Sequence, residues 1–404
     1  MQPLRVRPAE EGDLDRLIEI HRAAFPDSRT AAERRRNFVA KPFGGFEYLH
    51  VVESAGELVA HAFLFPFQVY VGGARVRVGG VATLGVAPEA RGRGTGRALM
   101  ARLHEIALER GDAATFLYPF RQGFYWALGY APASPLRALS LSPASVPRSL
   151  VDRTRIRLRS ASGADRGAME ALYLDEASRR TGWLVRPPRL WEHMLSDEAR
   201  AFLVAESTGE RPRPIGYLST TATQQEPHGE TRLRVHEIVA QDEPTRLAIV
   251  GELGLFRDQV DQIDVVLDAE DPLDRLLIDA DRRRPGTPDV EHAIGLVATG
   301  PMLRLLDARR ALEARGYPVD GAFDLAVDNA PPFGFLVEGG RGRALPPGGR
   351  PRLETSERAL AAIAYGGLTA SQAHRLGWLR CDGDVVAKAT ATFSLPPWHT
   401  LDPF

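Results

Sequence analysis

The sequence predicts a mixed fold, part α+β and part α/β, in three successive domains. Strand and helix signals alternate through the first 145 residues, the same order restarts near residue 150, and the pattern changes again near residue 287. A chain of 404 residues is also too long for one core, because domains usually hold roughly 150 residues. We therefore expect domains over residues 1–148, 149–286 and 287–404.

The first domain is expected to begin with a strand and an amphipathic helix, followed by a hairpin, a further strand, a long helix and another strand. The ranges in that order are 4–9, 12–25, 48–54 with 58–71, 74–88, 96–110 and 113–119. The first helix has one apolar face, formed by Leu14, Leu17, Ile18 and Ala24. Gly111 follows the long helix, where a glycine commonly ends one.

The second domain repeats this order without repeating its loop chemistry. Its predicted strands are 155–161, 201–207, 214–222, 232–240 and 263–268, and its predicted helices are 163–179 and 245–256. In the first domain the strand before the long helix is followed by a glycine and arginine stretch, whereas here the chain continues as QDEPTRLAIV over 241–250. We interpret the second domain as a degenerate copy that lacks an anion-binding loop.

The third domain differs from both. A strand and helix over 301–317 end at Gly316, and alternating apolar residues with turn glycines over 321–345 predict antiparallel strands. Two short helices are expected after them, over 357–366 and 371–377. This succession does not match the order of the first two domains, so we expect a separate α+β unit.

Composition narrows the function classes. Hydrophobic residues make up 44% and charged residues 25%, which is typical of globular proteins, and the net charge of −1 gives no bias toward nucleic acid or membrane. The single cysteine, Cys381, excludes an internal disulfide and fits a reducing compartment. The N-terminus has no apolar secretion signal, so we expect a cytoplasmic protein. No two histidines are four residues apart and no cysteine cluster exists, so we expect no metal.

The stretch RGRGTG at 91–96 is the strongest functional signal. It follows a predicted strand and opens a helix, where glycines expose backbone amides and the helix N-terminus favours an anion. No Gly-Lys-Ser/Thr follows, which excludes a P-loop, and the third glycine of a dinucleotide fingerprint is missing. Taken alone, the stretch has a second interpretation as an arginine-rich surface turn.

With its neighbours, LGVAPEARGRGTGRALM resembles the acetyl-CoA motif of the GCN5-related N-acetyltransferases (GNAT). The segment FLYPFRQGFYWALGYAPAS resembles one subfamily, the enhanced-intracellular-survival (Eis-like) enzymes. That resemblance implies two tandem GNAT-type domains, the second degenerate, then a domain like sterol carrier protein, in a homo-oligomer of hexameric or smaller size. It also implies acetyl-CoA as co-substrate. The residues implied in holding it are Thr83, Leu84, Gly85, Val86, Arg91, Gly92, Arg93, Gly94, Thr95 and Gly96.

The same resemblance implies the catalytic groups. Tyr125 would protonate the departing thiolate, for which a phenol of pKa ~10 is well matched. The terminal carboxylate, on Phe404, would accept the amine proton, and the apolar tail argues against a frayed end. Phe25 and Asp27 are expected to line the acceptor pocket, although an exposed Asp after a helix is equally ordinary.

We therefore predict an acetyl-CoA-dependent N-acetyltransferase. It would transfer acetyl directly to a primary amine, such as an aminoglycoside, a polyamine or a lysine. The alternative is a protein without catalysis, which senses acetyl-CoA or binds a lipid in the third domain. Turnover with any amine would separate these hypotheses.

Overall fold

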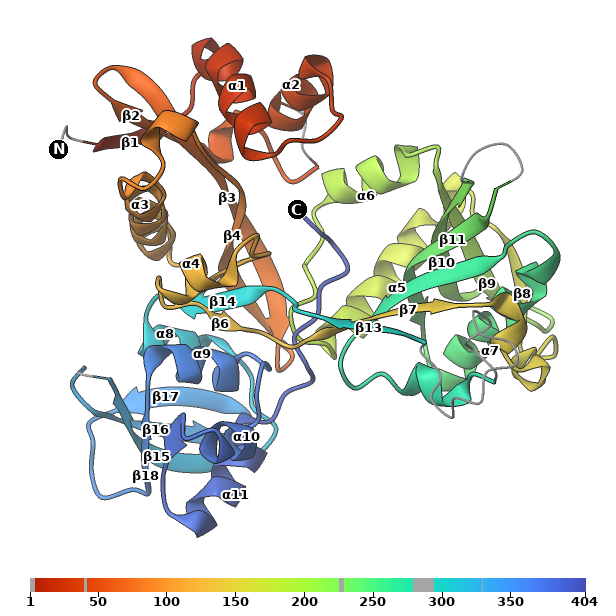
Figure 1. The fold of residues 1–404 in the computed structure, drawn as a ribbon. Helices are drawn as coiled ribbons and strands as arrows, with labels where there is room; N and C mark the ends of the chain where they lie inside the picture. Colours follow the sequence, from red (N-terminus) through yellow and green to blue (C-terminus); the bar gives the residue numbers. More distant parts are fainter. Residues whose placement is uncertain (1–3, 40–41, 225–228, 279–293, 329) are drawn as a thin grey trace, which may run out of the picture.

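The computed structural model describes residues 4–39, 42–224, 229–278, 294–328 and 330–404. Its strands form three sheets, which Figure 1 shows as three bodies, with the C-terminus between the first and the second. The first sheet has the order β1 (Leu4–Pro8), β2 (Leu49–Ser54), β3 (Glu57–Val71), β4 (Ala74–Val86), β5 (Ala114–Leu117), β14 (Met302–Leu305) and β6 (Ala131–Pro132).

The second sheet repeats this order. It runs β8 (Ile156–Ser160), β9 (Arg200–Ser207), β10 (Pro214–Gln224), β11 (Thr231–Ala240), β12 (Gln262–Leu267), β7 (Leu136–Leu141) and β13 (Gly295–Ala298). In each sheet the fourth and fifth strands of this order pair in parallel and all other neighbours are antiparallel. The internal repeat expected from the sequence is therefore present in the topology.

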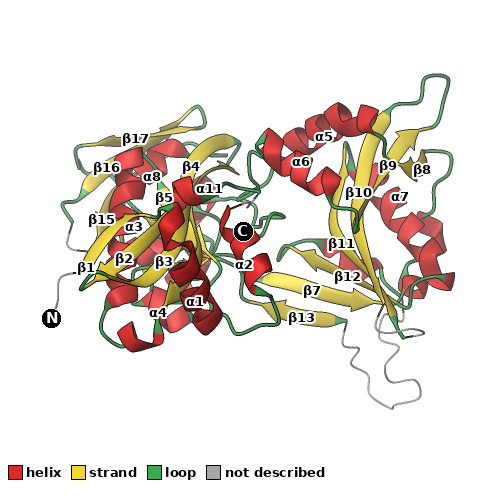
Figure 2. Cartoon of the chain, turned by 90° about the horizontal axis from the view of Figure 1, so that it is seen from above, coloured by secondary structure: helices red, strands yellow, loops and turns green. Residues whose placement is uncertain are grey.

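The third sheet stands apart, with the order β17 (Arg341–Leu345), β16 (Phe333–Glu338), β15 (Gly321–Val327), β18 (Arg352–Thr355) and β19 (Leu379–Arg380). The first domain carries α1 (Leu14–Ala24), α2 (Ala31–Val39), α3 (Thr95–Arg110) and α4 (Gln122–Trp126), and the second carries α5 (Arg166–Ser178), α6 (Pro188–Ser196) and α7 (Glu243–Leu253). The third carries α8 (Ala308–Ala314), α9 (Glu357–Ala364), α10 (Ala370–Arg375) and α11 (Gly383–Phe393). Figure 2 shows helices against the faces of the sheets.

The sheets do not follow the predicted ranges strand by strand. β7 lies within 1–148 yet pairs in the second sheet, and β14 lies within 287–404 yet pairs in the first. An alternating apolar pattern indicates a strand without naming its partner, so this exchange has no signal in the sequence. The predicted boundary at 286/287 lies outside the described residues.

One hydrophobic cluster runs through all three bodies. It joins Leu17 of α1, Trp183 of the second domain and Phe335 of β16, and it includes Trp398 in the C-terminal tail, which is fully buried. The tail is thus a structural element that all three bodies enclose. Burial on α1 also differs from the predicted face, because Ile20 and His21 are buried while Ile18 and Ala24 are half-buried.

Candidate active site

β4 and β5 form a fork at the centre of the first sheet. Their parallel pairing covers only residues 78–80 against 114–116 and ends at the pair Gly80 and Phe116, although β4 continues to Val86. Beyond this point β4 contains a bulge, where Thr83 and Leu84 both oppose Ala62 of β3. Thr83 has a φ of 55°, a conformation that costs a non-glycine residue energy and is enriched at functional sites. The bulge accompanies the departure of β4 from β5.

The loop from β4 to α3 leaves backbone amides exposed. Gly92 and Gly94 have φ angles of 72° and 82°, which side-chain-bearing residues rarely adopt. Gly94 is the N-cap of α3 and provides no side chain to cap it, so the first amides of the helix keep no intrahelical partner. The Thr95 hydroxyl donates to the Ala90 carbonyl at 3.1 Å and holds the loop closed from below. This arrangement suits an anion.

Arg91 braces the loop. Its Nε donates to the carbonyl of Val86 at 3.2 Å, and its Nη2 donates to the carbonyl of Ala23 at 2.9 Å. The side chain therefore ties the loop to the end of β4 and to the end of α1, and it adds a positive charge beside the amides.

A cleft of 760 Å³ runs from this loop toward α4. Most of the residues predicted to hold the cofactor line it, together with Phe25: Leu84, Val86, Arg91, Gly92, Gly94, Thr95 and Gly96. Thr83, Gly85 and Arg93 do not. Gly85 instead lies against a histidine, where an added Cβ would stand 2.6 Å from His61 Nε2, and Arg93 lines a separate 730 Å³ hollow. The apolar wall of the cleft contains Phe120 and Phe124, which the sequence reasoning did not single out.

Tyr125 lies on α4 and is almost completely buried, with 3% of its surface exposed. The rings of Phe120, Phe124 and Tyr130 pack around it with centroids 5.0 to 5.8 Å away. Burial, with a smaller contribution from Tyr130, raises the pKa of the Tyr125 hydroxyl above its ordinary value, so the group is protonated at neutral pH. In the described part of the chain no residue hydrogen-bonds this hydroxyl.

The hydroxyl of Tyr130, unlike that of Tyr125, has hydrogen-bond partners within the protein. Arg304 of β14 can only donate, so it fixes His104 Nδ1 as an acceptor at 3.0 Å. Burial lowers the pKa of His104 to about 3, so the ring is neutral and its Nε2–H donates to the Tyr130 hydroxyl at 2.9 Å. That hydroxyl then donates to Thr115 Oγ1 at 2.8 Å. The hydroxyl of Tyr130 is therefore used in hydrogen bonds within the protein, and of these two tyrosines Tyr125 is the one whose hydroxyl is available for chemistry.

The C-terminal residue lies at the fork. The Phe404 ring centroid is 4.8 Å from that of Phe116 and 5.0 Å from that of Phe67. A Cβ added at Gly80 would stand 3.0 Å from the Phe404 ring and 2.2 Å from the Phe67 ring. The last paired residues of β4 and β5, Gly80 and Phe116, are thus the ones that Phe404 touches. Because Phe404 is far from Gly80 and Phe116 in the sequence, the sequence alone does not predict this contact.

Asp27 is engaged in ion pairs. Its carboxylate accepts from Arg29 and, at 2.7 Å, from Nη2 of the buried Arg34. The hydrogen bonds from Arg29 and the two nearby positive charges hold the pKa of Asp27 below its ordinary value. Asp27 does not line the 760 Å³ cleft, whereas Phe25 does. Its charge is compensated, which weakens the expectation that it attracts a cationic amine.

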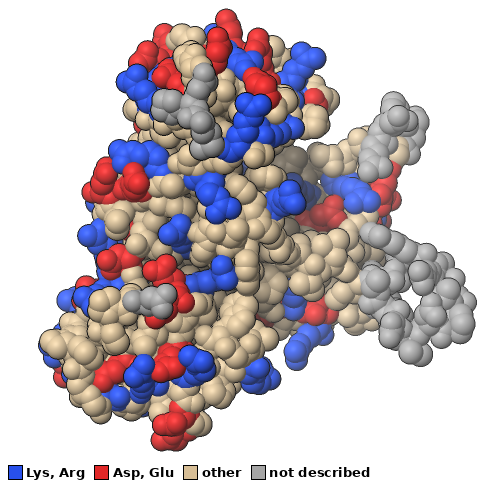
Figure 3. Space-filling model, turned by 60° about the vertical axis from the view of Figure 1, so that its left-hand side comes forward, with Lys and Arg blue, Asp and Glu red and all other residues tan. Residues whose placement is uncertain are grey.

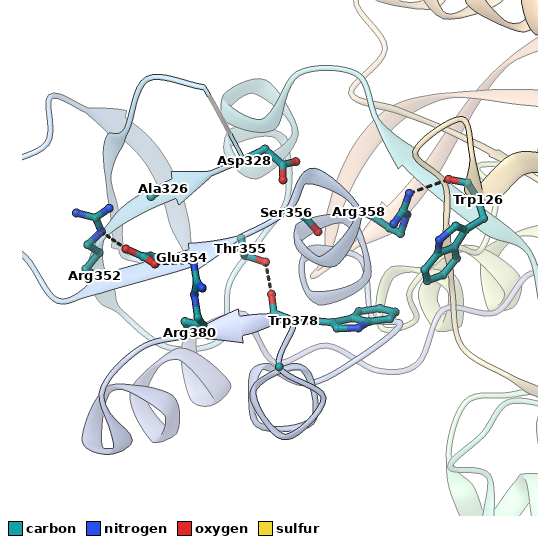
Figure 4. A pocket seen from close by; sticks show the side chains of 11 residues that line it. Trp126, Ala326, Asp328, Arg352, Glu354, Thr355, Ser356, Arg358, Trp378 and Arg380 are labelled. Carbon is teal, nitrogen blue, oxygen red and sulfur yellow. Dashed lines mark hydrogen bonds and ion pairs between the residues drawn. The ribbon is translucent and has the colours of Figure 1, made fainter.

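A second hollow, of 520 Å³, lies between α4 and the third sheet (Figure 4). Glu354 on its wall pairs with Arg352 at 2.8 Å and with Arg380 at 3.1 Å. Arg358 lies 4.2 Å from the Trp126 ring centroid and donates to the Trp126 carbonyl at 2.8 Å. Trp126 ends α4, so the third domain holds the helix that carries Tyr125.

Charges of both signs are mixed on one face of the molecule. Figure 3 shows Lys and Arg side chains interspersed with Asp and Glu across the face in view. Within the described ranges, no three His, Cys, Asp or Glu residues are grouped to hold a metal ion. Among those same residues, no helix is long and apolar enough to cross a membrane.

Comparison with known proteins agrees with this geometry. Two models of acetyltransferase (GNAT) domains match the chain, one over residues 5–133 and the other over 182–305. N-acetyltransferase Eis of Mycobacterium tuberculosis is 28% identical over 356 residues, which cover 84% of this chain and 83% of that protein. A GCN5-related N-acetyltransferase of Kribbella flavida is 27% identical with a TM-score of 0.81, over 100% of this chain and 99% of its own.

A second solved structure shares the whole fold. The GCN5-related N-acetyltransferase of Anabaena variabilis superposes with a TM-score of 0.84 at 23% identity, and the match covers 100% of both chains. The second sheet is therefore a GNAT domain in its own right, as the repeated element order predicted.

Proposed function

Because the chain is an Eis-like N-acetyltransferase of the GNAT family that uses acetyl-CoA, we propose that it acetylates a primary amine at the fork between β4 and β5. The transfer is direct, with no covalent intermediate on the protein. The loop amides at 92–97 hold the pyrophosphate, and the backbone at Leu84 and Val86 lies along the cleft for the pantetheine arm.

The chemistry needs one proton acceptor and one proton donor. The amine nitrogen attacks the thioester carbonyl, a C–N bond forms, and the C–S bond breaks. The amine proton passes to the terminal carboxylate on Phe404, directly or through water, and the thiolate takes a proton from the Tyr125 hydroxyl. The products are the N-acetyl amine and free CoA. A terminal carboxylate of ordinary pKa ~3.5 is ionised at neutral pH and ready to accept.

The acetyl acceptor in this proposal is a primary amine, namely an aminoglycoside, a polyamine or a lysine side chain. Two observations bear on this choice. Asp27 is paired with Arg29 and Arg34, and Asp402, near the C-terminus, is paired with Arg186. Neither carboxylate is free to bind a polycation, and the rings around Phe404 favour an acceptor with an apolar portion.

One observation carries the proposal: Phe404 packs on the last paired residues of β4 and β5, and β4 continues from there to Leu84 and Val86, which line the cofactor cleft. The test measures CoA release from acetyl-CoA over a panel of amines. It compares the native chain with one extended by a single glycine after Phe404. The extension moves the carboxylate and leaves the loop intact, so we expect kcat to fall by ~100-fold or more and the acetyl-CoA Kd to hold. Equal turnover by both chains would place the base elsewhere.

The third domain has a structural part in this proposal. We assign it to the sterol-carrier-protein-like class on its separate five-stranded sheet, and its contact through Arg358 steadies α4. The alternative of a non-catalytic acetyl-CoA sensor or lipid carrier is disfavoured, because it gives no reason for a buried C-terminal tail at the fork.

A further inference from the structure

The C-terminal tail follows a fixed course before it reaches the fork. The amide of Trp398 donates to the Gly366 carbonyl at 3.1 Å, and the amide of His399 donates to the Thr181 carbonyl at 2.9 Å. A Cβ at Gly182, which has a φ of 89°, would stand 2.6 Å from the His399 carbonyl. The tail is thus fitted against residues 181–182 of the second domain. Figures 1 and 2 both place the C-terminus between the first and second sheets.

The same segment is bonded to β3 of the first sheet. The Val185 amide donates to the Gln68 carbonyl at 2.8 Å, and the Gly182 amide donates to the Tyr70 carbonyl at 2.8 Å. β3 also carries Phe67, which packs on Phe404. Residues 181–186 therefore lie between the tail and the sheet that holds the fork, and they link one to the other.

A buried ion pair fixes the last turn of the tail. Arg186 Nε lies 2.9 and 3.0 Å from the two Asp402 oxygens, and Arg186 Nη2 lies 2.8 Å from Oδ1. The two side chains are 1% and 3% exposed. Arg186 also donates to Glu237 of β11 at 2.7 Å, and Arg200 donates to the second Glu237 oxygen at 2.9 Å. The four charges balance.

Aromatic rings confine the Arg186 guanidinium. Its carbon lies 3.8 Å from the Tyr173 ring centroid and 5.0 Å from that of Trp191. Buried ion pairs add little net stability, because desolvation offsets their attraction, but they hold a single geometry. Two residues separate Asp402 from the chain end, and each can span at most ~3.6 Å. Fixing Asp402 therefore keeps the Phe404 Cα within about 7 Å of the Asp402 Cα, and the terminal carboxylate lies one bond beyond it.

We propose that Arg186 is a positioning residue for acetyl transfer, which orients the Phe404 carboxylate by holding Asp402. The retained role of the degenerate second domain is then to fix the catalytic end of the chain. This inference rests on the proposed function, since it concerns the carboxylate assigned there as base.

The test is a double-mutant cycle between Asp402→Asn and the one-glycine extension after Phe404. Asp402→Asn keeps the side-chain size and leaves Arg186 its ion pair with Glu237, which it shares with Arg200, so the group then carries one net positive charge. The thermal midpoint of the variant is measured first, and kcat is compared at a temperature where the variant is folded. We expect kcat to fall ~10- to 100-fold and acetyl-CoA Kd to stay within twofold. Added to the extended chain, the substitution should cause no further fall, because the carboxylate is already displaced.

A matched control uses another buried carboxylate of the second domain. Asp165 accepts from Arg159 at 2.8 Å and is 5% exposed, and it lies outside the tail. Asp165→Asn should lower the thermal midpoint without changing kcat. If Asp402→Asn leaves kcat unchanged, or if its effect multiplies with that of the extension, the positioning role is overturned. If the extension itself has no effect, the base assignment fails, and the positioning role fails with it.

Discussion

In both GNAT sheets of this chain a central strand pairs in parallel with its neighbour over a few residues and then leaves it. β4 pairs with β5 up to Gly80, and β11 pairs with β12 up to Val235. Each strand then bulges, at Thr83 and Leu84 in the first fork and at His236 in the second. The backbone design of the two forks is the same.

The forks differ in what fills them. The first opens onto the 760 Å³ cleft, whereas the second keeps only 50 Å³, lined in part by His399 and Leu401 of the tail. The helix ends differ as well. α3 starts at Gly94 with no side-chain cap, while Asp242 accepts the Thr245 amide at 2.8 Å at the start of α7. The first amides of α3 are therefore without a side-chain cap, whereas a carboxylate of the protein binds an amide at the start of α7.

The comparison shows that the GNAT topology is the same whether or not an open cleft lies at the fork. The sheet forms with either an open or a filled fork, because its hydrogen bonds do not depend on the loop after the fourth strand. In this chain part of the tail lines the second fork, and the end of the tail reaches the first.

The largest expected effect concerns Tyr125, on the helix α4 that follows β5 of the first fork. Tyr125→Phe removes the hydroxyl that we propose protonates the thiolate, so kcat should fall ~10²- to 10⁴-fold while the acetyl-CoA KM changes little. Steady-state CoA release measures both. Because burial raises the pKa of Tyr125, this group should cause no loss of activity up to pH ~10.

Tyr130→Phe is the matched control, since it removes a buried hydroxyl of the same domain. That hydroxyl bonds His104 and Thr115, so the variant should lose about 1–3 kcal/mol of unfolding free energy and keep most of its kcat. If Tyr125→Phe retained a third of the native kcat, another group would be the general acid, and Tyr125 would not distinguish the first fork from the second.

The next effect tests the glycine loop. Gly94→Val puts a branched side chain at a φ of 82° where the anion is expected, so the acetyl-CoA Kd should weaken ~10- to 100-fold, the equivalent of one or two charge-assisted hydrogen bonds. Calorimetric titration measures it. Gly56→Val, in the β2–β3 turn at a φ of 81°, introduces the same strain away from the cleft. If both variants lost a similar amount of acetyl-CoA affinity, the effect at Gly94 would come from general destabilisation and the loop would not be the anion site.

Much of the first fork could be predicted from the sequence. Glycines at 92 and 94 directly before a helical pattern indicate an uncapped helix start, and the structure gives both positive φ angles there. The repeat also showed in the element order. The spacing and type of residues along the chain are enough to give both signals, and neither depends on which side chains meet in the fold.

What could not be predicted depends on contacts between distant residues. Arg186 and Asp402 are 216 positions apart and carry no motif, and β14 reaches the first sheet from beyond residue 300. The helices α6 and α11 and the short α4 were also missed. Arg34 lies in the charged run ERRRNF at 33–38, whose residue types favour exposure, yet it is 1% exposed and bonded to His21 Nδ1 at 2.7 Å.

The smallest effect concerns the capped start of α7. The hydrogen bonds from Thr245 hold the pKa of Asp242 below its ordinary value. A carboxylate with a lowered folded-state pKa adds stability above its unfolded pKa of ~3.9, and this stability is lost as the pH falls through the folded value. At pH 7, Asp242→Ala should therefore cost about 1 kcal/mol of unfolding free energy, and Asp242→Asn, which still caps, only a few tenths.

Urea unfolding at pH 7 and again near pH 3 measures this difference. The gap between native chain and Asp242→Ala should narrow at the lower pH, while kcat stays unchanged throughout. If Asp242→Ala instead created a second acetyl-CoA site, seen as a binding stoichiometry above one per chain, the carboxylate alone would have closed the second fork. We expect one site per chain, because His399 and Leu401 still line what remains of that fork after the cap is gone.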